Sequence, residues 1–171
     1  MCDCDCSRSR IDLIYLEVIL SLVLKASIGS FLASVAFGVL FNIKYEKLWL
    51  AGFTGMVGGF VYVSCLQMGC SDVFSNFFAT ICFTICAEIL ARTCKTPVTT
   101  FIVCALIPLV PGAKMYEMII EIIKNCPDRA LSLFLETLSI AGSLAVAILV
   151  VETITWIVLD LKKKVRTRQA L

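Results

Sequence analysis

The chain has 171 residues, of which 60% are hydrophobic and 16% are charged. Soluble domains average about 45–50% apolar and about 25% charged residues, so this composition predicts an integral membrane protein. A formal charge of +2 is too small to indicate nucleic-acid binding, and the absence of histidine excludes histidine-based catalysis and histidine metal ligands. We expect one helical membrane domain over residues 1–171, with no enzyme active site, cofactor or bound metal.

The first ten residues hold Cys2, Cys4 and Cys6, which alternate with acidic residues. Such a tail could bind a soft metal or oxidise, but its spacing matches no known zinc module. Most of the other cysteines lie inside apolar runs, where cysteine packs as a small hydrophobic side chain. We therefore predict that residues 1–10 form a disordered tail without a metal site.

Five apolar stretches predict an all-α polytopic membrane protein, because a spanning helix needs about 20 apolar residues. The first stretch is interrupted by Glu17 and Lys25. We interpret residues 11–24 as an amphipathic or interfacial lead-in and residues 26–41 as the core of the first span. The remaining predicted spans are residues 48–68, 73–91, 97–110 and 131–159.

The fourth span is broken by Pro108 and Pro111, with Gly112 directly after them. Proline has no N–H for the carbonyl four residues earlier, so the carbonyls of Cys104 and Ile107 lose their helical donors. In a membrane such groups are tolerated only inside protein or beside a water-filled cavity. Transporters use unwound backbone of this kind to hold polar solutes. The break is thus either a helix end at the interface or a solute site.

The fourth span is also short, at roughly 21 Å for a rise of about 1.5 Å per residue. A hydrocarbon core is about 30 Å thick, so the segment after the break must continue the crossing or the bilayer must thin. That segment predicts an amphipathic helix, which lies in the interface or lines a water-filled path with its polar face. Its apolar face holds Met115, Met118, Ile119, Ile122 and Ile123, and its polar face holds Lys114, Glu117, Glu121 and Lys124.

The basic residues predict the orientation in the cell (cytoplasmic) membrane. The tail at residues 162–171 is basic and should be cytoplasmic by the positive-inside rule. Counting back through five spans places two further connections inside, which carry Lys44, Lys47, Arg92 and Lys95. The N-terminus and the connection at residues 67–72 then lie outside.

Small residues recur every four positions on three of the predicted spans. Close backbone approach at such stripes supplies much of the energy of helix association in lipid. The stripes predict that these helices pack within the chain or against a partner, and a homo-oligomer is a further alternative. The stripes are Ala26, Ser30, Ser34 and Gly38 in the first span, Gly55 and Gly59 in the second, and Ala141 and Ala145 in the fifth.

Ionisable residues within spans are functional candidates, because burying them is costly. An i,i+4 ion pair with Arg92 explains Glu88, and proximity to the basic tail explains Glu152 and Asp160 as anchors. Glu136 is harder to explain. It would carry a coupling proton or neutralise a substrate amine, or it lies at the outer interface.

Several residues fall in the order of a known family. These are Phe41-Asn42-Ile43, Ala51-Gly52, Arg92 with Lys95 and Pro97, Ile107-Pro108-Leu109-Val110-Pro111-Gly112 followed by Tyr116, and Ile140-Ala141-Gly142. Together they resemble the small membrane component of the threonine/serine exporter family over residues 11–164. The Pro-x-x-Pro-Gly with the following tyrosine is the most specific element. Lys44 stands where many members have proline, and the cysteine-rich N-terminus is not typical of the family.

The resemblance implies a subunit of a secondary transporter that exports threonine and serine, or small dicarboxylates, together with a larger membrane partner. Its pathway residues would be Pro108, Pro111, Gly112, Tyr116, Glu117 and Glu136. The alternative is a structural or assembly subunit that stabilises a transport partner through its small-residue faces without contacting substrate. A membrane enzyme has little support, since the chain shows no nucleophile–base pair.

Overall fold

The computed structural model describes residues 4–169, whose backbone forms helices and no strands. Four helices are long and apolar enough to cross a membrane, and a bent pair makes a fifth candidate. The prediction of an all-α polytopic protein with one broken helix is confirmed. The elements are α1 (Cys4–Leu40), α2 (Tyr45–Gln67), α3 (Asp72–Thr93), α4 (Val98–Leu106), the 3-10 helix η1 (Ile107–Leu109), α5 (Gly112–Ile123) and α6 (Pro127–Gln169).

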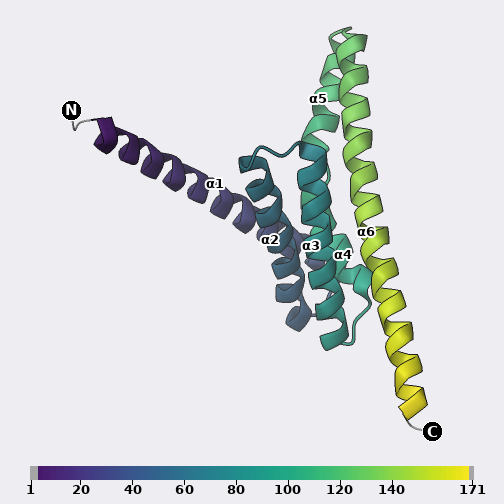
Figure 1. Ribbon diagram of the computed structural model, residues 1–171. Coiled ribbons are helices and arrows are strands. Elements are labelled where there is room, and N and C mark those ends of the chain that lie inside the picture. The colour runs from purple at the N-terminus through teal and green to yellow at the C-terminus, as the bar shows by residue number, and fades with distance from the viewer. Residues whose placement is uncertain (1–3, 170–171) are drawn as a thin grey trace.

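The helices form a central bundle with two extensions (Figure 1). In the bundle α2 and α3 lie side by side, with α4 and the middle of α6 against α3. The first half of α1 runs away from the bundle, and α5 pairs with the first turns of α6 in a hairpin that extends past the α2–α3 connection. The α3–α4 connection lies at the same end as the C-terminus, so α4 and α5 together lead from that end to the other.

Helix α1 is continuous, so the predicted division into a lead-in at residues 11–24 and a span at residues 26–41 is wrong. Glu17 and Lys25 do not interrupt it, because straight-chain charged residues are good helix formers. The span candidate within it is Glu17–Leu40. The helix backbone already begins at Cys4, inside the predicted tail, whereas Cys2 and the side chains of Cys4 and Cys6 lie outside the described part.

The connections between helices are tight because several helices end in the same hydrogen-bonded motif. After α1, the Asn42 N–H donates to the Val39 carbonyl at 3.0 Å and the Ile43 N–H donates to the Gly38 carbonyl at 3.1 Å. This pair of hydrogen bonds needs a residue with a left-handed backbone conformation, which glycine and asparagine adopt most easily. The left-handed residues are Asn42 (φ 54), Gly69 (φ 85), Lys95 (φ 50) and Asn125 (φ 57).

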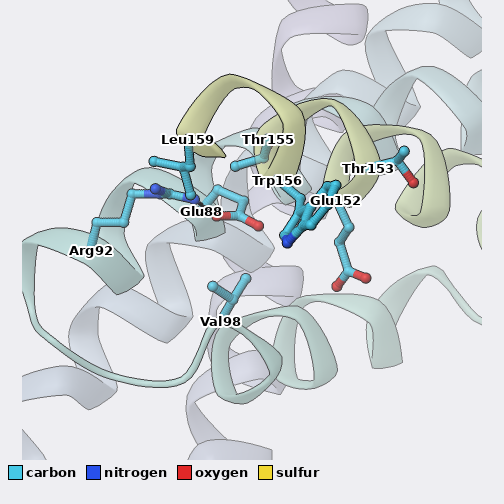
Figure 2. A pocket seen from close by; sticks show the side chains of 8 residues that line it. All are labelled: Glu88, Arg92, Val98, Glu152, Thr153, Thr155, Trp156 and Leu159. Atoms are coloured by element: carbon cyan, nitrogen blue, oxygen red, sulfur yellow. Dashed lines mark hydrogen bonds and ion pairs between the residues drawn. The ribbon is translucent and has the colours of Figure 1, made fainter. Parts of the chain in front are cut away.

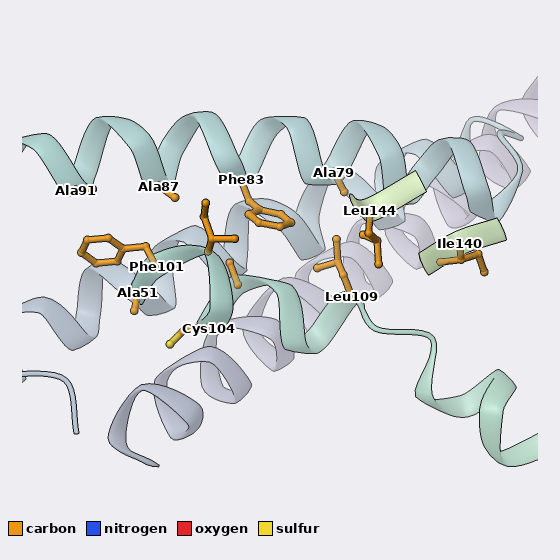
Figure 3. Close-up of a cluster of buried hydrophobic side chains, with 12 residues drawn as sticks. Ala51, Ala79, Phe83, Ala87, Ala91, Phe101, Cys104, Leu109, Ile140 and Leu144 are labelled. Carbon is orange, nitrogen blue, oxygen red and sulfur yellow. The ribbon is translucent and has the colours of Figure 1, made fainter. Parts of the chain in front are cut away.

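The apolar core lies between α3, α4 and α6, and two phenylalanines fill its centre (Figure 3). Phe83 of α3 and Phe101 of α4 are fully buried. Small side chains on α3 let α4 approach closely, and α6 adds Ile140 and Leu144. The buried alanines of α3 are Ala79, Ala87 and Ala91. This core fixes α4, and therefore the position at which the broken helix turns.

The small-residue stripes of α1 and α2 pack against each other. A Cβ added to Gly55 would lie 1.8 Å from the Ser34 Oγ, and one added to Gly59 would lie 2.2 Å from the Ser30 Oγ. A Cβ on Gly38 would lie 2.6 Å from a methyl group of Leu48. Only glycine permits this spacing, so these stripes form an interface within the chain.

The small stripe of the last span lies elsewhere. Ala141 and Ala145 are exposed, whereas Ile140, Leu144 and Ala147 form the buried face of α6. The buried face of α6 is therefore formed by Ile140, Leu144 and Ala147, and the stripe of Ala141 and Ala145 faces away from the core.

Candidate functional site

The predicted break bends the chain without ending the membrane segment. Helix α4 continues through η1 to Leu109, and α5 begins at Gly112. The two parts of the bent pair differ in direction by 46°. Pro108 lies within η1, and Pro111 directly precedes the first residue of α5. The prolines thus mark the bend, and the chain continues into a further helix.

Both carbonyls that the prolines release have donors within the protein. The Ser34 hydroxyl of α1 donates to the Cys104 carbonyl at 2.9 Å, and both residues are fully buried. The Val110 N–H donates to the Ile107 carbonyl at 3.2 Å in the 3-10 turn. Buried carbonyls need partners, and here the chain supplies them itself. Of the two environments expected for these groups, the structure therefore shows the protein interior, while their role in binding a solute stays a prediction.

Ser34 can reach the break because Gly55 leaves room behind it. A Cβ on Gly55 would approach the Ser34 Oγ to 1.8 Å and the Ser34 Cβ to 2.7 Å. The serine is thus held between the α2 backbone and the Cys104 carbonyl of α4. Sequence reasoning treated Ser34 only as a packing residue, although its spacing on the stripe placed it on the correct face.

A cluster of three charged residues lies just after the break. The Lys114 ammonium contacts carboxylate oxygens of both Asp72 and Glu136. Lys114 lies at the start of α5, Asp72 in the first turn of α3 and Glu136 in the first part of α6; the side chains of Lys114 and Asp72 are partly buried, and that of Glu136 is exposed. We call Asp72, Lys114 and Glu136 the charge cluster. Glu136 was predicted as a candidate, whereas its partners were missed because they follow from the bend.

The other predicted residues of α5 lie apart from the charge cluster. Tyr116 is exposed on the outside of α5, as are Met115, Ile119, Ile122 and Ile123. Glu117 lines a groove of about 380 Å³ between α5 and α6, together with Glu121, Lys124 and Arg129. The charged side of α5 therefore faces α6, and its apolar side faces outward.

Helix α3 carries a polar residue at every fourth position along its whole length. Asn76, Thr80, Thr84 and Glu88 are at most 9% exposed. The Thr80 hydroxyl donates to the Asn76 carbonyl at 2.7 Å, but the buried Thr84 hydroxyl has no partner among the described residues. We call this set the α3 polar row: Asp72, Asn76, Thr80, Thr84, Glu88 and Arg92. Sequence reasoning missed it, although the spacing of four was visible.

The row leads from the charge cluster to a pocket at the other end of α3 (Figure 2). This pocket has a volume of about 560 Å³ and opens between α3, the start of α4 and α6. Glu88 and Arg92 form the predicted i,i+4 ion pair in it, at 2.7 Å. Glu152 and Trp156 of α6 line it as well, so two glutamates that the sequence analysis explained independently share one pocket.

Comparison with known proteins gives one match. A family model described as "Threonine/Serine exporter, ThrE" matches residues 26–154, which include the break, the charge cluster and the pocket residues up to Thr153. Neither the curated proteins nor the solved structures contain a match. The matched range is well over half of the chain and runs from α1 into α6. The chain therefore belongs to the threonine/serine exporter family.

Proposed function

We propose that the chain is a membrane subunit of a secondary transporter that exports threonine and serine, or related small carboxylates, together with a larger membrane partner. Membership of the exporter family and the apolar helices support a transport role in a membrane. The basic residues Lys44, Lys47, Arg92 and Lys95 support a cytoplasmic position for the end of the bundle that holds the C-terminus.

The α3 polar row is the observation that carries this proposal. Burying a hydroxyl without a hydrogen-bond partner costs free energy, and ionisable groups such as Glu88, near the end of this row, generally mark pathways inside membrane domains. The Thr84 hydroxyl is such a group. A bundle that only had to pack would be more stable with apolar residues there. The row also connects two charged sites, so we assign it to the path that the solute follows.

The break takes a different role from the one expected from the sequence. Because the Cys104 and Ile107 carbonyls have donors, Pro111 and Gly112 act by turning the chain. The turn brings Lys114 to Asp72 and Glu136, which form the end of the path opposite the pocket. Pro108, Tyr116 and Glu117 stay candidates for the same path.

An assembly role has less support. Such a role needs small-residue faces that are free to bind a partner, but the small-residue faces of α1 and α2 pack against each other. Only the stripe of Ala141 and Ala145 on α6 is exposed. The transport role is therefore the better explanation of the buried polar residues.

The test is efflux of labelled threonine, serine and succinate from cells that express the chain together with a candidate larger multi-span partner. Thr84→Val should lower efflux, because it removes a hydroxyl from the proposed path. The amount of membrane-inserted protein should stay equal, because the Thr84 hydroxyl forms no hydrogen bond among the described residues that the change could break. Thr54→Val is the matched control, since Thr54 is also fully buried but lies on α2, where its hydroxyl bonds its own helix at 2.7 Å. Wild-type efflux by the Thr84→Val variant would remove the row from the path.

A further inference from the structure

Cys65 and Cys70 occupy the two positions that the motif at the end of α2 brings together. The Gly69 N–H donates to the Leu66 carbonyl at 3.0 Å, and outside this bond the Cys70 N–H donates to the Cys65 carbonyl at 3.2 Å. Gly69 has the left-handed conformation that the motif requires, with a φ of 85°. The side chains of the two residues that the outer bond joins commonly touch in this motif. The end of α2 thus places two thiols side by side.

The backbone at this helix end meets the distance requirement of a disulfide. Each Cα lies about 2.4 Å from its own carbonyl oxygen and about 1.5 Å from its own nitrogen. With the 3.2 Å hydrogen bond between them, the Cα atoms of Cys65 and Cys70 are at most about 7 Å apart, and closer because the bonds are not in line. Disulfides join Cα atoms that are about 4.4–6.8 Å apart. In the same motif at the end of α1, a Cβ on Gly38 would lie 3.6 Å from a methyl group of Ile43, so side chains at these positions face each other.

Packing does not explain both cysteines of this pair. Cys70 is exposed on the α2–α3 connection, and Cys65 is only partly buried. The described helices α1, α2, α3 and α5 end in this motif, and only α2 has cysteine at both positions. In α5 the corresponding residues are Glu121 and the exposed Cys126, so the position opposite that cysteine holds a carboxylate instead of a thiol. The arrangement in α2 is therefore suited to a reaction between its two cysteines.

We propose that Cys65 and Cys70 are a redox-active dithiol that closes to a disulfide by exchange with a disulfide oxidant. The thiolate of the exposed Cys70 attacks the oxidant and displaces one thiolate from it, which leaves a mixed disulfide on Cys70. The Cys65 thiolate then attacks the Cys70 sulfur and displaces the second thiolate of the oxidant. The oxidant takes up the two electrons and the two protons that the protein thiols lose, and it leaves as two thiols.

The disulfide locks the connection that leads into the charge cluster. Asp72 begins α3 two residues after Cys70 and contacts Lys114. A covalent bond across the end of α2 restricts the backbone of this connection, so the oxidised form holds Asp72 more firmly. The connection lies at the end of the bundle opposite the C-terminus (Figure 1). The orientation proposed above places that end outside the cell, where disulfides form and persist.

The test treats the purified, fully reduced chain in detergent micelles with oxidised glutathione under argon, followed by mass spectrometry of its fragments. Cys70 should lose its thiol without retaining glutathione, because Cys65 displaces it. Cys126 is the internal control and should retain glutathione, since its counterpart in the motif is Glu121. Cys65→Ser should leave glutathione on Cys70, whereas Cys82→Ser should not, because Cys82 lies on α3 outside the motif.

Amide hydrogen exchange measures the effect of the disulfide on the connection. Exchange at Gly69 and Cys70 should be several-fold slower in the oxidised chain than in the reduced chain, and this difference should vanish in Cys70→Ser. No reaction at Cys70, a stable glutathione adduct on Cys70 of the wild-type chain, loss of that adduct in Cys65→Ser, or unchanged exchange would each overturn the proposal. Neither measurement involves transport, so the result is independent of the export function.

Discussion

Replacing Ser34 with alanine tests whether the break is held by a single side chain from another helix. The Ser34 hydroxyl is the donor to the Cys104 carbonyl, whose helical donor is missing because of Pro108. A buried group left without a partner costs about 1–3 kcal/mol, while interhelical hydrogen bonds in membrane proteins average about 0.6 and reach about 1.7 kcal/mol. Since the site is fully buried, we expect Ser34→Ala to lose about 1–2 kcal/mol.

The assay is unfolding of the purified chain in mixed micelles, followed by circular dichroism. Ser30→Ala is the matched control, because Ser30 lies one turn earlier on the same stripe but forms no hydrogen bond within the described residues. It should shift the free energy of unfolding by less than about 0.5 kcal/mol. Alkylation of Cys104, whose side chain is fully buried, should accelerate in Ser34→Ala by about tenfold if the local loss is about 1.4 kcal/mol.

A paired substitution checks the steric part of the same argument. Gly55→Ala places a Cβ 1.8 Å from the Ser34 Oγ and should be strongly destabilising. Combining it with Ser34→Gly removes that clash and should recover part of the loss, so the two changes will not be additive. Equal losses in Ser34→Ala and Ser30→Ala, or no recovery in the double variant, would refute the reasoning.

Two further predictions follow from the bend and the core. Lys114→Met should raise amide hydrogen exchange throughout α5 several-fold, because Lys114 links α5 to α3 and α6 through ion pairs. These pairs are partly exposed and therefore worth about 1 kcal/mol or less. Lys124→Met is the control and should not raise exchange, because Lys124 pairs only with Glu121 of α5. Gly58→Ala should lower the free energy of unfolding, since its Cβ would lie 3.2 Å from atoms of two core side chains. Gly142→Ala has open space and should be neutral or gain about 0.5–1 kcal/mol. Unchanged exchange in the first case, or equal effects of the two glycine replacements, would contradict these expectations.

The span positions and the break could be predicted because they depend on local composition. An apolar run determines where a helix crosses the membrane, and a proline removes an N–H donor. Both effects reach only a few residues along the chain. The division of α1 failed for a related reason: Glu17 and Lys25 lower hydropathy without lowering helix propensity. Hydropathy thus located the membrane segment but not the ends of the helix.

The contacts of the candidate site depended on pairing between distant segments. Ser34 and Cys104 are 70 positions apart, and no local pattern links them. Lys114 meets Asp72 and Glu136 only because the chain bends by 46° and α6 runs back beside α5. The α3 polar row is different, since its spacing of four could have been read directly. Each of its threonines alone gives no signal, and only their repeat at a spacing of four indicates a polar face on the helix.

Helix α6 links the two charged ends of the molecule mechanically. Glu136 belongs to the charge cluster and Glu152 to the pocket, and sixteen positions on one helix separate them by about 24 Å. If α6, a continuous helix of 43 residues, tilts as a rigid rod about its contact with α3, its two arms move in opposite directions. Glu136 and Glu152 lie on opposite arms, so such a tilt would change the charge cluster and the pocket together.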